Sequence, residues 1–208
     1  MSQINVNTIA PYSGDTVLVN HIKTNSTIGL LNVNSATGEQ SYAEGYFTTA
    51  SGNNSHAEGS QTIASGLCSH VEGLNCVAGG IGSHAGGSTS LSFGDYSFSH
   101  GNANNSSGFA TQTFGQENVV TGNYSTAFGI QNDISGFYGF VHSQGSVLTG
   151  NNSAIIGGVN ITGTSSSTVY VPKLETTQTG EGIIMKSPDG TRWKLTIANG
   201  GSISVTLA

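Results

Sequence analysis

A fixed 14-residue repeat constrains the fold of this chain more than any other feature. Residues 41–166 divide into nine equal segments, the rungs, whose positions are numbered 1 to 14. Glycine occupies position 5 in eight of the nine rungs, with Ser143 as the exception, and position 12 in eight, with Thr164 as the exception. A short period that runs on without insertions indicates a solenoid, in which successive rungs stack on one another.

Each rung is expected to hold two short β-strands, at positions 1–5 and 8–12, with the closing glycines allowing tight corners. Alternate residues of a strand face opposite sides. Positions 3 and 10 carry small residues in the early rungs and larger aliphatic ones later, so they are expected to fill a narrow interior together with the serines of position 1. The sequence therefore predicts an all-β, parallel β-roll over residues 41–166.

The two ends differ from the repeats. Residues 1–40 contain short alternating stretches and are predicted to form an N-terminal β attachment segment. Residues 167–208 are predicted to form a small β cap, because a solenoid needs its open end covered. There, residues 167–172 are expected to leave the rod, and the turn Ser187–Gly190 to join two strands of a hairpin. The three expected strands of the cap cover residues 182–186, 193–197 and 202–207.

Charge and composition exclude several functions. All five Lys and Arg residues lie outside residues 41–166, which hold six acids, so binding of nucleic acid or anionic membranes is disfavoured. No apolar run approaches the roughly 20 residues that span a bilayer, so membrane insertion is not expected. The N-terminus lacks the pattern of a signal peptide, which predicts synthesis in a cytoplasm. Cys68 and Cys76 do not form a disulfide framework.

Positions 2 and 4 must face outward, yet they carry a stripe of rings and aliphatic side chains. An exposed apolar stripe indicates an interface, and closed cyclic association around it would bury it. A homotrimer is the natural geometry for a fibre, although the stripe alone does not determine the number of chains. The predicted interface residues are Tyr42, His56, His70, His84, Phe98, His100, Phe114, Phe128, Phe140, His142 and Ile156.

The rungs resemble the head repeats of trimeric autotransporter adhesins of the Yersinia-adhesin type. Residues 55–59, SHAEG, and residues 125–129, STAFG, carry the S-x-A-x-G core of that repeat. The resemblance implies a left-handed parallel β-roll, three copies of which pack around an axis with positions 2 and 4 turned inward. The sequence lacks the signal peptide, heptad stalk and C-terminal membrane anchor of that family, so its secretion is not expected to carry over.

The two ends resemble segments of bacteriophage fibres instead. Residues 7–17, NTIAPYSGDTV, are similar to a segment of phage tail-fibre proteins, and residues 187–196, SPDGTRWKLT, to the C-terminal ends of phage fibre and virion appendage proteins. With a trimeric roll, these similarities imply a virion fibre. Its expected partners are further copies of itself, other virion proteins and a glycan of the host surface.

Histidines and glutamates suggest a metal site on the outward stripe. His56, His70 and His84 occupy position 2 of consecutive rungs, about 4.8 Å apart along the stack, and Glu58 and Glu72 lie two residues after the first two. Around a three-fold axis, one such pair from each chain would offer three nitrogens and three oxygens to a divalent transition metal. The alternative is a polar axis of His–Glu hydrogen bonds, waters or anions.

A second candidate site consists of aromatic residues at rung positions 13 and 14, beside the corners. On an uncharged polar rod they could stack on sugars, or they could cover the junction between neighbouring chains. These candidate glycan-binding residues are Tyr96, Phe109, Tyr124, Phe137 and Tyr138.

Catalysis is not expected, because Asp95, Glu117 and Asp133 are scattered over different rungs and positions. The sequence thus predicts a structural bacteriophage fibre, on head or tail, that projects from the particle and contacts the host surface. One alternative is a dedicated receptor-binding tail fibre with a specific glycan site. Another is a capsule-degrading spike enzyme.

Overall fold

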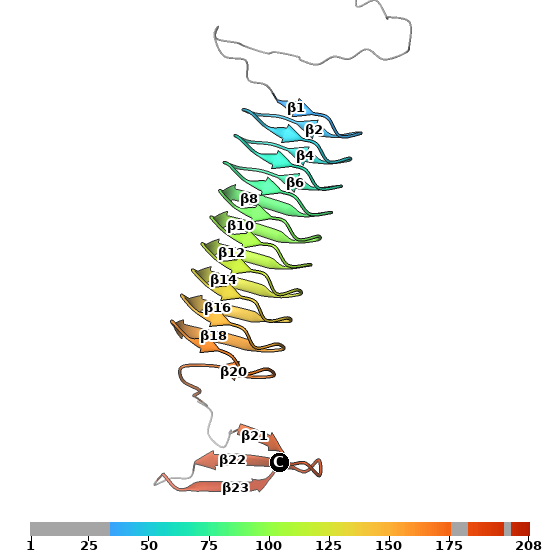
Figure 1. Cartoon of the computed structure of the whole chain (residues 1–208). Coiled ribbons are helices and arrows are strands. Elements are labelled where there is room, and N and C mark those ends of the chain that lie inside the picture. The colour runs from blue at the N-terminus through green and yellow to red at the C-terminus, as the bar shows by residue number, and fades with distance from the viewer. Residues whose placement is uncertain (1–33, 176–182, 198–200) are drawn as a thin grey trace, which may run out of the picture. The chain divides into compact units, whose positions relative to one another are not determined.

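The described part of the chain is built from β-strands. A computed structural model describes residues 34–175, 183–197 and 201–208, and every helix or strand in these residues is a strand (Figure 1). The same residues therefore contain no helix that is long and apolar enough to cross a membrane. The strands predicted within residues 1–33 lie outside the described residues.

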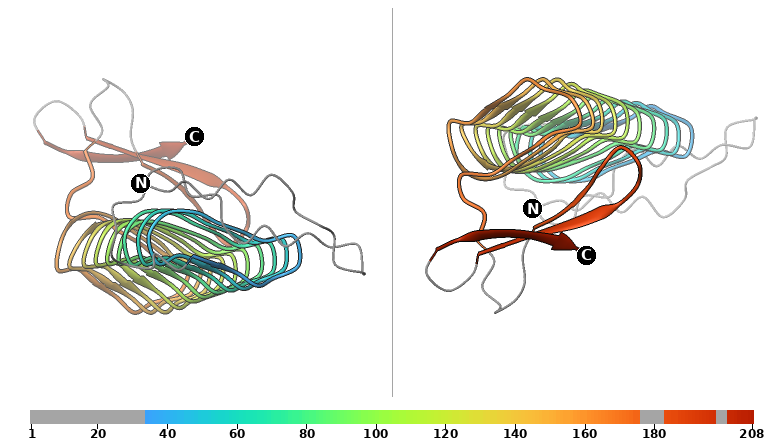
Figure 2. Two further views of the ribbon diagram at one scale, coloured as in Figure 1. Left: turned by 90° about the horizontal axis from the view of Figure 1, so that it is seen from above. Right: turned by 90° about the horizontal axis from the view of Figure 1, so that it is seen from below.

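Two parallel ten-stranded sheets form the two walls of a solenoid (Figures 1 and 2). The first sheet contains β1 (Ser35–Ala36), β3 (Thr49–Ala50), β5 (Ile63–Ala64), β7 (Val77–Ala78), β9 (Leu91–Ser92), β11 (Asn105–Ser106), β13 (Val119–Val120), β15 (Asp133–Ile134), β17 (Val147–Leu148) and β19 (Thr162–Gly163). The second contains β2 (Tyr42–Ala43), β4 (His56–Ala57), β6 (His70–Val71), β8 (His84–Ser88), β10 (Phe98–Asn102), β12 (Gln112–Gln116), β14 (Thr126–Ile130), β16 (Phe140–Gln144), β18 (Ala154–Val159) and β20 (Val169–Tyr170). The predicted parallel β-solenoid is confirmed.

The corners of each rung lie at positions 7 and 14, not at the glycines. Apart from a few glycines, residues at these positions have φ between 52° and 58°, the left-handed helical region. This conformation turns the peptide N–H back toward the preceding rung, so Asn54 N donates to Glu39 O (2.7 Å). Strand residues donate the other way, as His56 N does to Ser69 O (2.9 Å). Each rung is therefore tied to both neighbours.

The repeated glycines allow the stacked backbones to approach closely. At position 5, Gly115 has φ +113°, and a Cβ there would lie 2.1 Å from the carbonyl oxygen of Gly129. At position 12, a Cβ on Gly122 would lie 2.1 Å from the carbonyl oxygen of Gly136. No side chain fits at such distances. The expectation that these glycines form the corners was therefore wrong, although their spacing located the rungs correctly.

The ninth rung contains one extra residue, which shifts its second half. Val147 pairs with Thr162, 15 residues on, and the register between β16 and β18 is irregular beyond His142. The predicted phase was therefore wrong at the end of the repeats: Gly163, not Thr162, pairs with the buried Leu148. Ser143, the exception at position 5, lies at this irregularity, where the regular stacking that requires glycine is interrupted.

The solenoid extends beyond both predicted boundaries. β1 pairs with β3, so stacking begins before residue 41. β20 pairs with β18, so residues 169–170 continue the rod, whereas the sequence predicted a strand leaving it. Both segments lack the repeat glycine at position 5, which is why the pattern did not include them.

The interior is filled as predicted by positions 3 and 10. An early cluster of small residues and a late cluster of larger ones are both fully buried. The early cluster consists of Ala50, Ala57, Ala64, Val71, Cys76, Ala78 and Ala85, and the late cluster of Val120, Ala127, Ile134, Val141, Leu148 and Ile155. Between them the core is polar: the hydroxyl groups of Ser99, Ser106 and Thr113 are hydrogen bonded in a row at 2.9 Å.

Position 8 is a third interior position, which the sequence analysis missed. It carries a ladder of buried asparagines, in which Asn118 Nδ2 donates to Asn104 Oδ1 (3.0 Å) and Asn132 Nδ2 donates to Asn118 Oδ1 (2.9 Å). Asn118 Nδ2 also donates to the carbonyl oxygens of Phe114 (3.1 Å) and Gly129 (2.8 Å). The ladder therefore satisfies buried carbonyl groups beside the position 5 glycines.

Replacing Asn118 by Ala is expected to destabilise the solenoid by about 3 kcal/mol, because several buried polar groups lose their partners at once. Thermal unfolding followed by circular dichroism measures the loss. Asn123→Ala is the matched control, since the Asn123 side chain is partly exposed and accepts one hydrogen bond, from Phe109 N (2.9 Å). Equal losses in the two variants would contradict a special role of the ladder.

Three antiparallel strands form a separate sheet near the C-terminus: β21 (Ile183–Lys186), β22 (Arg192–Ile197) and β23 (Ile203–Leu207). Met185 pairs with Trp193, and Gly190 N donates to Ser187 O (2.9 Å), so the predicted hairpin and its turn are confirmed. The role of this sheet as a cap stays a prediction.

Candidate functional site: the outward ladder

Positions 2 and 4 of the rungs face outward along the second sheet, as the sequence predicted. None of the eleven predicted interface residues is buried within the chain. At the two ends of the stripe, 58% of Tyr42 and 47% of Ile156 are exposed. This outward set of positions 2 and 4, from Tyr42 to Ile156, is called the outward ladder below. Its burial by other chains stays a prediction.

Rings of the outward ladder stack on one another from rung to rung. Parallel in-register strands bring equal positions of adjacent rungs about 4.8 Å apart. The imidazoles of His56 and His70 accordingly stack with centroids 4.9 Å apart and planes 2° apart, and the rings of Phe114 and Phe128 with centroids 5.0 Å apart and planes 6° apart. The series passes from position 2 to position 4 where Phe98 contacts Phe114 (5.2 Å). Ring contacts thus link Tyr42 to His142 without a break in the described contacts.

Histidines and glutamates meet across rungs rather than within one. The Nε2 atom of His56 lies 3.7 Å from Glu44 Oε1, and the same distance separates His70 from Glu58 and His84 from Glu72. The sequence analysis had paired His56 with Glu58 and His70 with Glu72 of the same rung. These pairings were incomplete, because each imidazole is turned toward the carboxylate of the preceding rung.

The histidine nitrogens have no hydrogen-bond partner within the chain. The Nε2 atoms of His56, His70 and His84 are inaccessible to solvent and unpaired, since 3.7 Å is too long for a hydrogen bond. Burial lowers the pKa of His84, and the neighbouring His70 acts in the same direction, against the attraction of Glu72. A lowered pKa favours the neutral imidazole, which is the form that binds metals.

The aromatic corner residues form a second, separate ladder. Tyr96 contacts Phe109 (5.5 Å), Phe109 contacts Tyr124 (5.3 Å), and Tyr124 stacks on Tyr138 (5.1 Å, 5°). All four rings and Phe137 are exposed, by 36% to 59%. The predicted placement beside the corners is confirmed, and sugar binding stays a prediction.

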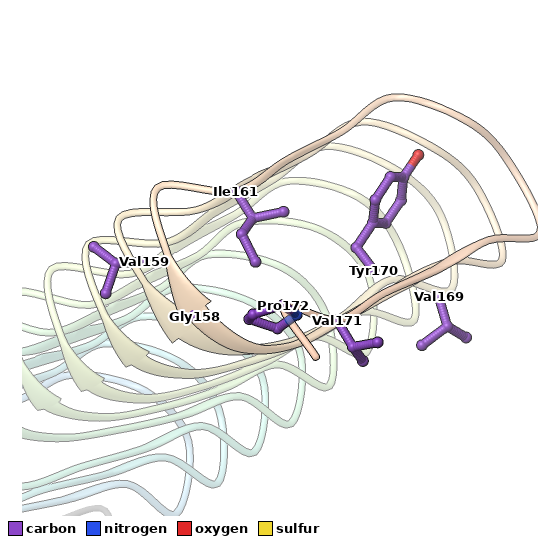
Figure 3. A pocket seen from close by; sticks show the side chains of 7 residues that line it. All are labelled: Gly158, Val159, Ile161, Val169, Tyr170, Val171 and Pro172. Atoms are coloured by element: carbon purple, nitrogen blue, oxygen red, sulfur yellow. The ribbon is translucent and has the colours of Figure 1, made fainter. Parts of the chain in front are cut away.

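An apolar pocket of about 480 Å³ lies at the last rung (Figure 3). Its walls come from Gly158 to Ile161 on one side and from Val169 to Pro172 on the other. Ile161 and Tyr170 also pack against the late core cluster. Ser165 N donates to the Tyr170 hydroxyl oxygen (2.7 Å), so this ring is held across the end of the core.

The remaining reactive groups are dispersed. Both cysteines are free, and burial raises the pKa of the Cys76 thiol. Asp95 accepts a hydrogen bond from Ile81 N (2.8 Å), and Glu117 accepts one from Gln131 Nε2 (2.8 Å). These two acids therefore connect adjacent rungs at the corners.

The fold and its outward ladder define the class of the chain: a parallel β-solenoid of stacked 14-residue rungs with one ring-bearing face. Comparison with known proteins adds no family, since no family model matches the sequence and a search of curated proteins finds no match.

Proposed function

We propose that the chain is a structural, homotrimeric fibre of a bacteriophage particle, mounted on head or tail, that projects outward and contacts the host cell surface. The observation that carries this proposal is the outward ladder. A rod with one continuous stripe of stacked rings buries that stripe best against copies of itself.

The composition of the ladder favours association along its length. Apolar area removed from water contributes about 25 cal/mol per Å², and the half-exposed rings of Phe98, Phe114 and Phe128 are already aligned by stacking within one chain. Such pre-organised side chains lose little conformational entropy on binding. The absence of Lys and Arg from residues 41–166 also removes one source of charge repulsion at the axis.

The assignment to a phage particle rests on resemblance at the two ends of the chain. Residues 7–17 and 187–196 are similar to segments of phage fibre and appendage proteins, and the repeats resemble trimeric adhesin heads. A fibre of this kind acts passively: it presents a polar surface of Asn, Ser and Thr to the host.

The full-length chain is expected to be a trimer of about 64 kDa in solution, three times 21.2 kDa. Light scattering coupled to size-exclusion chromatography at micromolar concentration measures the mass. A stable monomer would refute the burial of the outward ladder. Antibodies against the chain, visualised by electron microscopy on intact particles, should then decorate a projecting appendage.

A second candidate function is receptor binding to a specific glycan, favoured by the exposed corner ladder of Tyr96, Phe109, Tyr124 and Tyr138. Aromatic faces at about 5 Å spacing on an uncharged surface are suited to stacking on sugars. Glycan-array binding that is lost in Tyr124→Ala would support this function. Release of oligosaccharides from capsule would instead support the other alternative, a capsule-degrading spike enzyme.

A further inference from the structure

Three potential ligand groups converge near the N-terminal end of the outward ladder. One ligand atom each from Glu44, His56 and Glu58 lies within 4.8 Å of the other two. The residues come from two consecutive rungs, with His56 on β4 stacked directly above Tyr42 on β2. The pairs Glu58–His70 and Glu72–His84 repeat the motif in later rungs. Among the described residues, however, only the first group brings three such atoms this close together.

The spacing fits shared coordination better than hydrogen bonding. Zinc binds nitrogen and oxygen ligands at about 2.0–2.2 Å, so two ligands of one tetrahedral ion lie roughly 3.3–3.5 Å apart. The distance of 3.7 Å between His56 Nε2 and Glu44 Oε1 is close to this value and longer than a hydrogen bond. A small rotation of the two exposed or half-exposed glutamates is enough to close the set.

The nitrogen at the centre of the group lacks a partner. The Nε2 atom of His56 is inaccessible to solvent and has no hydrogen bond, although the rest of the ring is partly exposed. A buried polar atom without a partner is unfavourable, and a metal ion would satisfy it. The Tyr42 hydroxyl donates to the other oxygen of Glu44 (3.3 Å), which leaves Oε1 turned toward His56.

The surrounding charge also favours a cation. Glu44, Glu58 and Glu72 follow one another along this face, and no Lys or Arg occurs anywhere in residues 41–166. The carboxylates therefore lack a basic side chain from the rungs that could neutralise them. A divalent ion would supply that charge, and a mixed nitrogen and oxygen ligand set favours a transition metal over Mg²⁺ or Ca²⁺.

We propose that Glu44, His56 and Glu58 of one chain bind a single divalent transition metal ion of the Zn²⁺ type, with water completing the coordination. The site differs from the axial arrangement suggested by the sequence, because one chain supplies all three protein ligands. It does not depend on the proposed trimer or on the proposed biological role. Its expected effect is to fasten the first rungs of the solenoid together.

Cobalt titration of the tag-free, full-length chain tests the site after chelator treatment and dialysis. We expect one Co²⁺ per chain, with the visible d–d absorption of a four-coordinate ion, and one Zn²⁺ per chain by elemental analysis. Glu44→Gln should weaken binding at least tenfold, and its side chain is exposed enough that folding should be preserved. His142→Gln is the matched control, since it removes a histidine from the same face without touching the group.

Each outcome of the titration decides the matter. Loss of the d–d absorption in Glu44→Gln, with His142→Gln and Glu72→Gln unchanged, supports the site. One ion per three chains would overturn it in favour of an axial site. Undiminished binding in a Glu44→Gln variant that circular dichroism shows to be folded, or no binding by the intact chain at micromolar Co²⁺, would also overturn it.

Discussion

Gly115→Ala is expected to lower the unfolding temperature of the chain by about 6–12 °C. Gly115 occupies position 5 in the middle of the solenoid, where its φ of +113° is a conformation that residues with a side chain rarely adopt. The new Cβ would also lie 2.1 Å from the Gly129 carbonyl oxygen, which is fixed in the next rung. Backbone strain and overpacking each cost roughly 1–3 kcal/mol. A loss of about 3 kcal/mol corresponds to that temperature shift for a chain of this length.

Gly86→Ala is the control for this prediction. It is the same substitution in the second sheet, but the φ of Gly86 is ordinary, and a Cβ there would meet side-chain atoms of Glu72 and His100 at 3.0–3.3 Å. These long side chains can move, so the expected loss is within about 1 kcal/mol. Thermal unfolding of both variants by circular dichroism makes the comparison. Equal unfolding temperatures would show that close backbone approach does not explain the glycine repeat.

Much of the fold was predictable because one physical constraint recurs every 14 residues. Gly115 and its equivalents mark where stacked backbones nearly touch, and this close approach made both the period and the parallel register visible in the sequence. The corners were not predictable in the same way. The left-handed positions 7 and 14 hold residues as different as Phe47, Asn54 and Tyr124, because the fold imposes this conformation through hydrogen bonds to the preceding rung.

The ends of the solenoid could not be located from the repeat for a related reason. β1 and β20 stack by backbone hydrogen bonds alone, without the position 5 glycine that identifies a rung. The extra residue of the ninth rung had no signal either, because the consecutive glycines Gly157 and Gly158 fit either phase. The exception at Ser143 was visible in the sequence, but its meaning depends on the irregular pairing beside it.

The candidate site was predictable in its direction but not in its contacts. Period-two alternation was sufficient to place His56 and Glu58 on the outer face. Which carboxylate each imidazole faces depends on side-chain rotamers, and these turn His56 toward Glu44 in the preceding rung. The buried ladder at Asn118 was missed because asparagine is also a common residue of exposed loops, so its type alone gave no sign of burial.

Phe128→Asp is expected to convert the trimer into monomers while leaving the rungs folded. Phe128 is half-buried within the chain and stacks on Phe114 at 5.0 Å, in the middle of the outward ladder. If the ladder lies at the trimer axis, the substitution removes three rings from the interface and brings three carboxylates together there. Each ring contributes roughly 2–3 kcal/mol by burial, so the trimer loses about 6–9 kcal/mol before charge repulsion is counted.

Phe109→Asp separates this effect from the loss of stacking within one chain. Phe109 is also partly exposed, and its ring contacts Tyr96 at 5.5 Å and Tyr124 at 5.3 Å, but it lies at a corner and outside the outward ladder. Light scattering should therefore find monomers for Phe128→Asp and trimers for Phe109→Asp, with β-sheet circular dichroism retained in both. A trimeric Phe128→Asp variant would place the outward ladder on the surface of the assembly. Dissociation of Phe109→Asp alone would move the interface to the corner ladder, because that face would then be the one that holds the chains together.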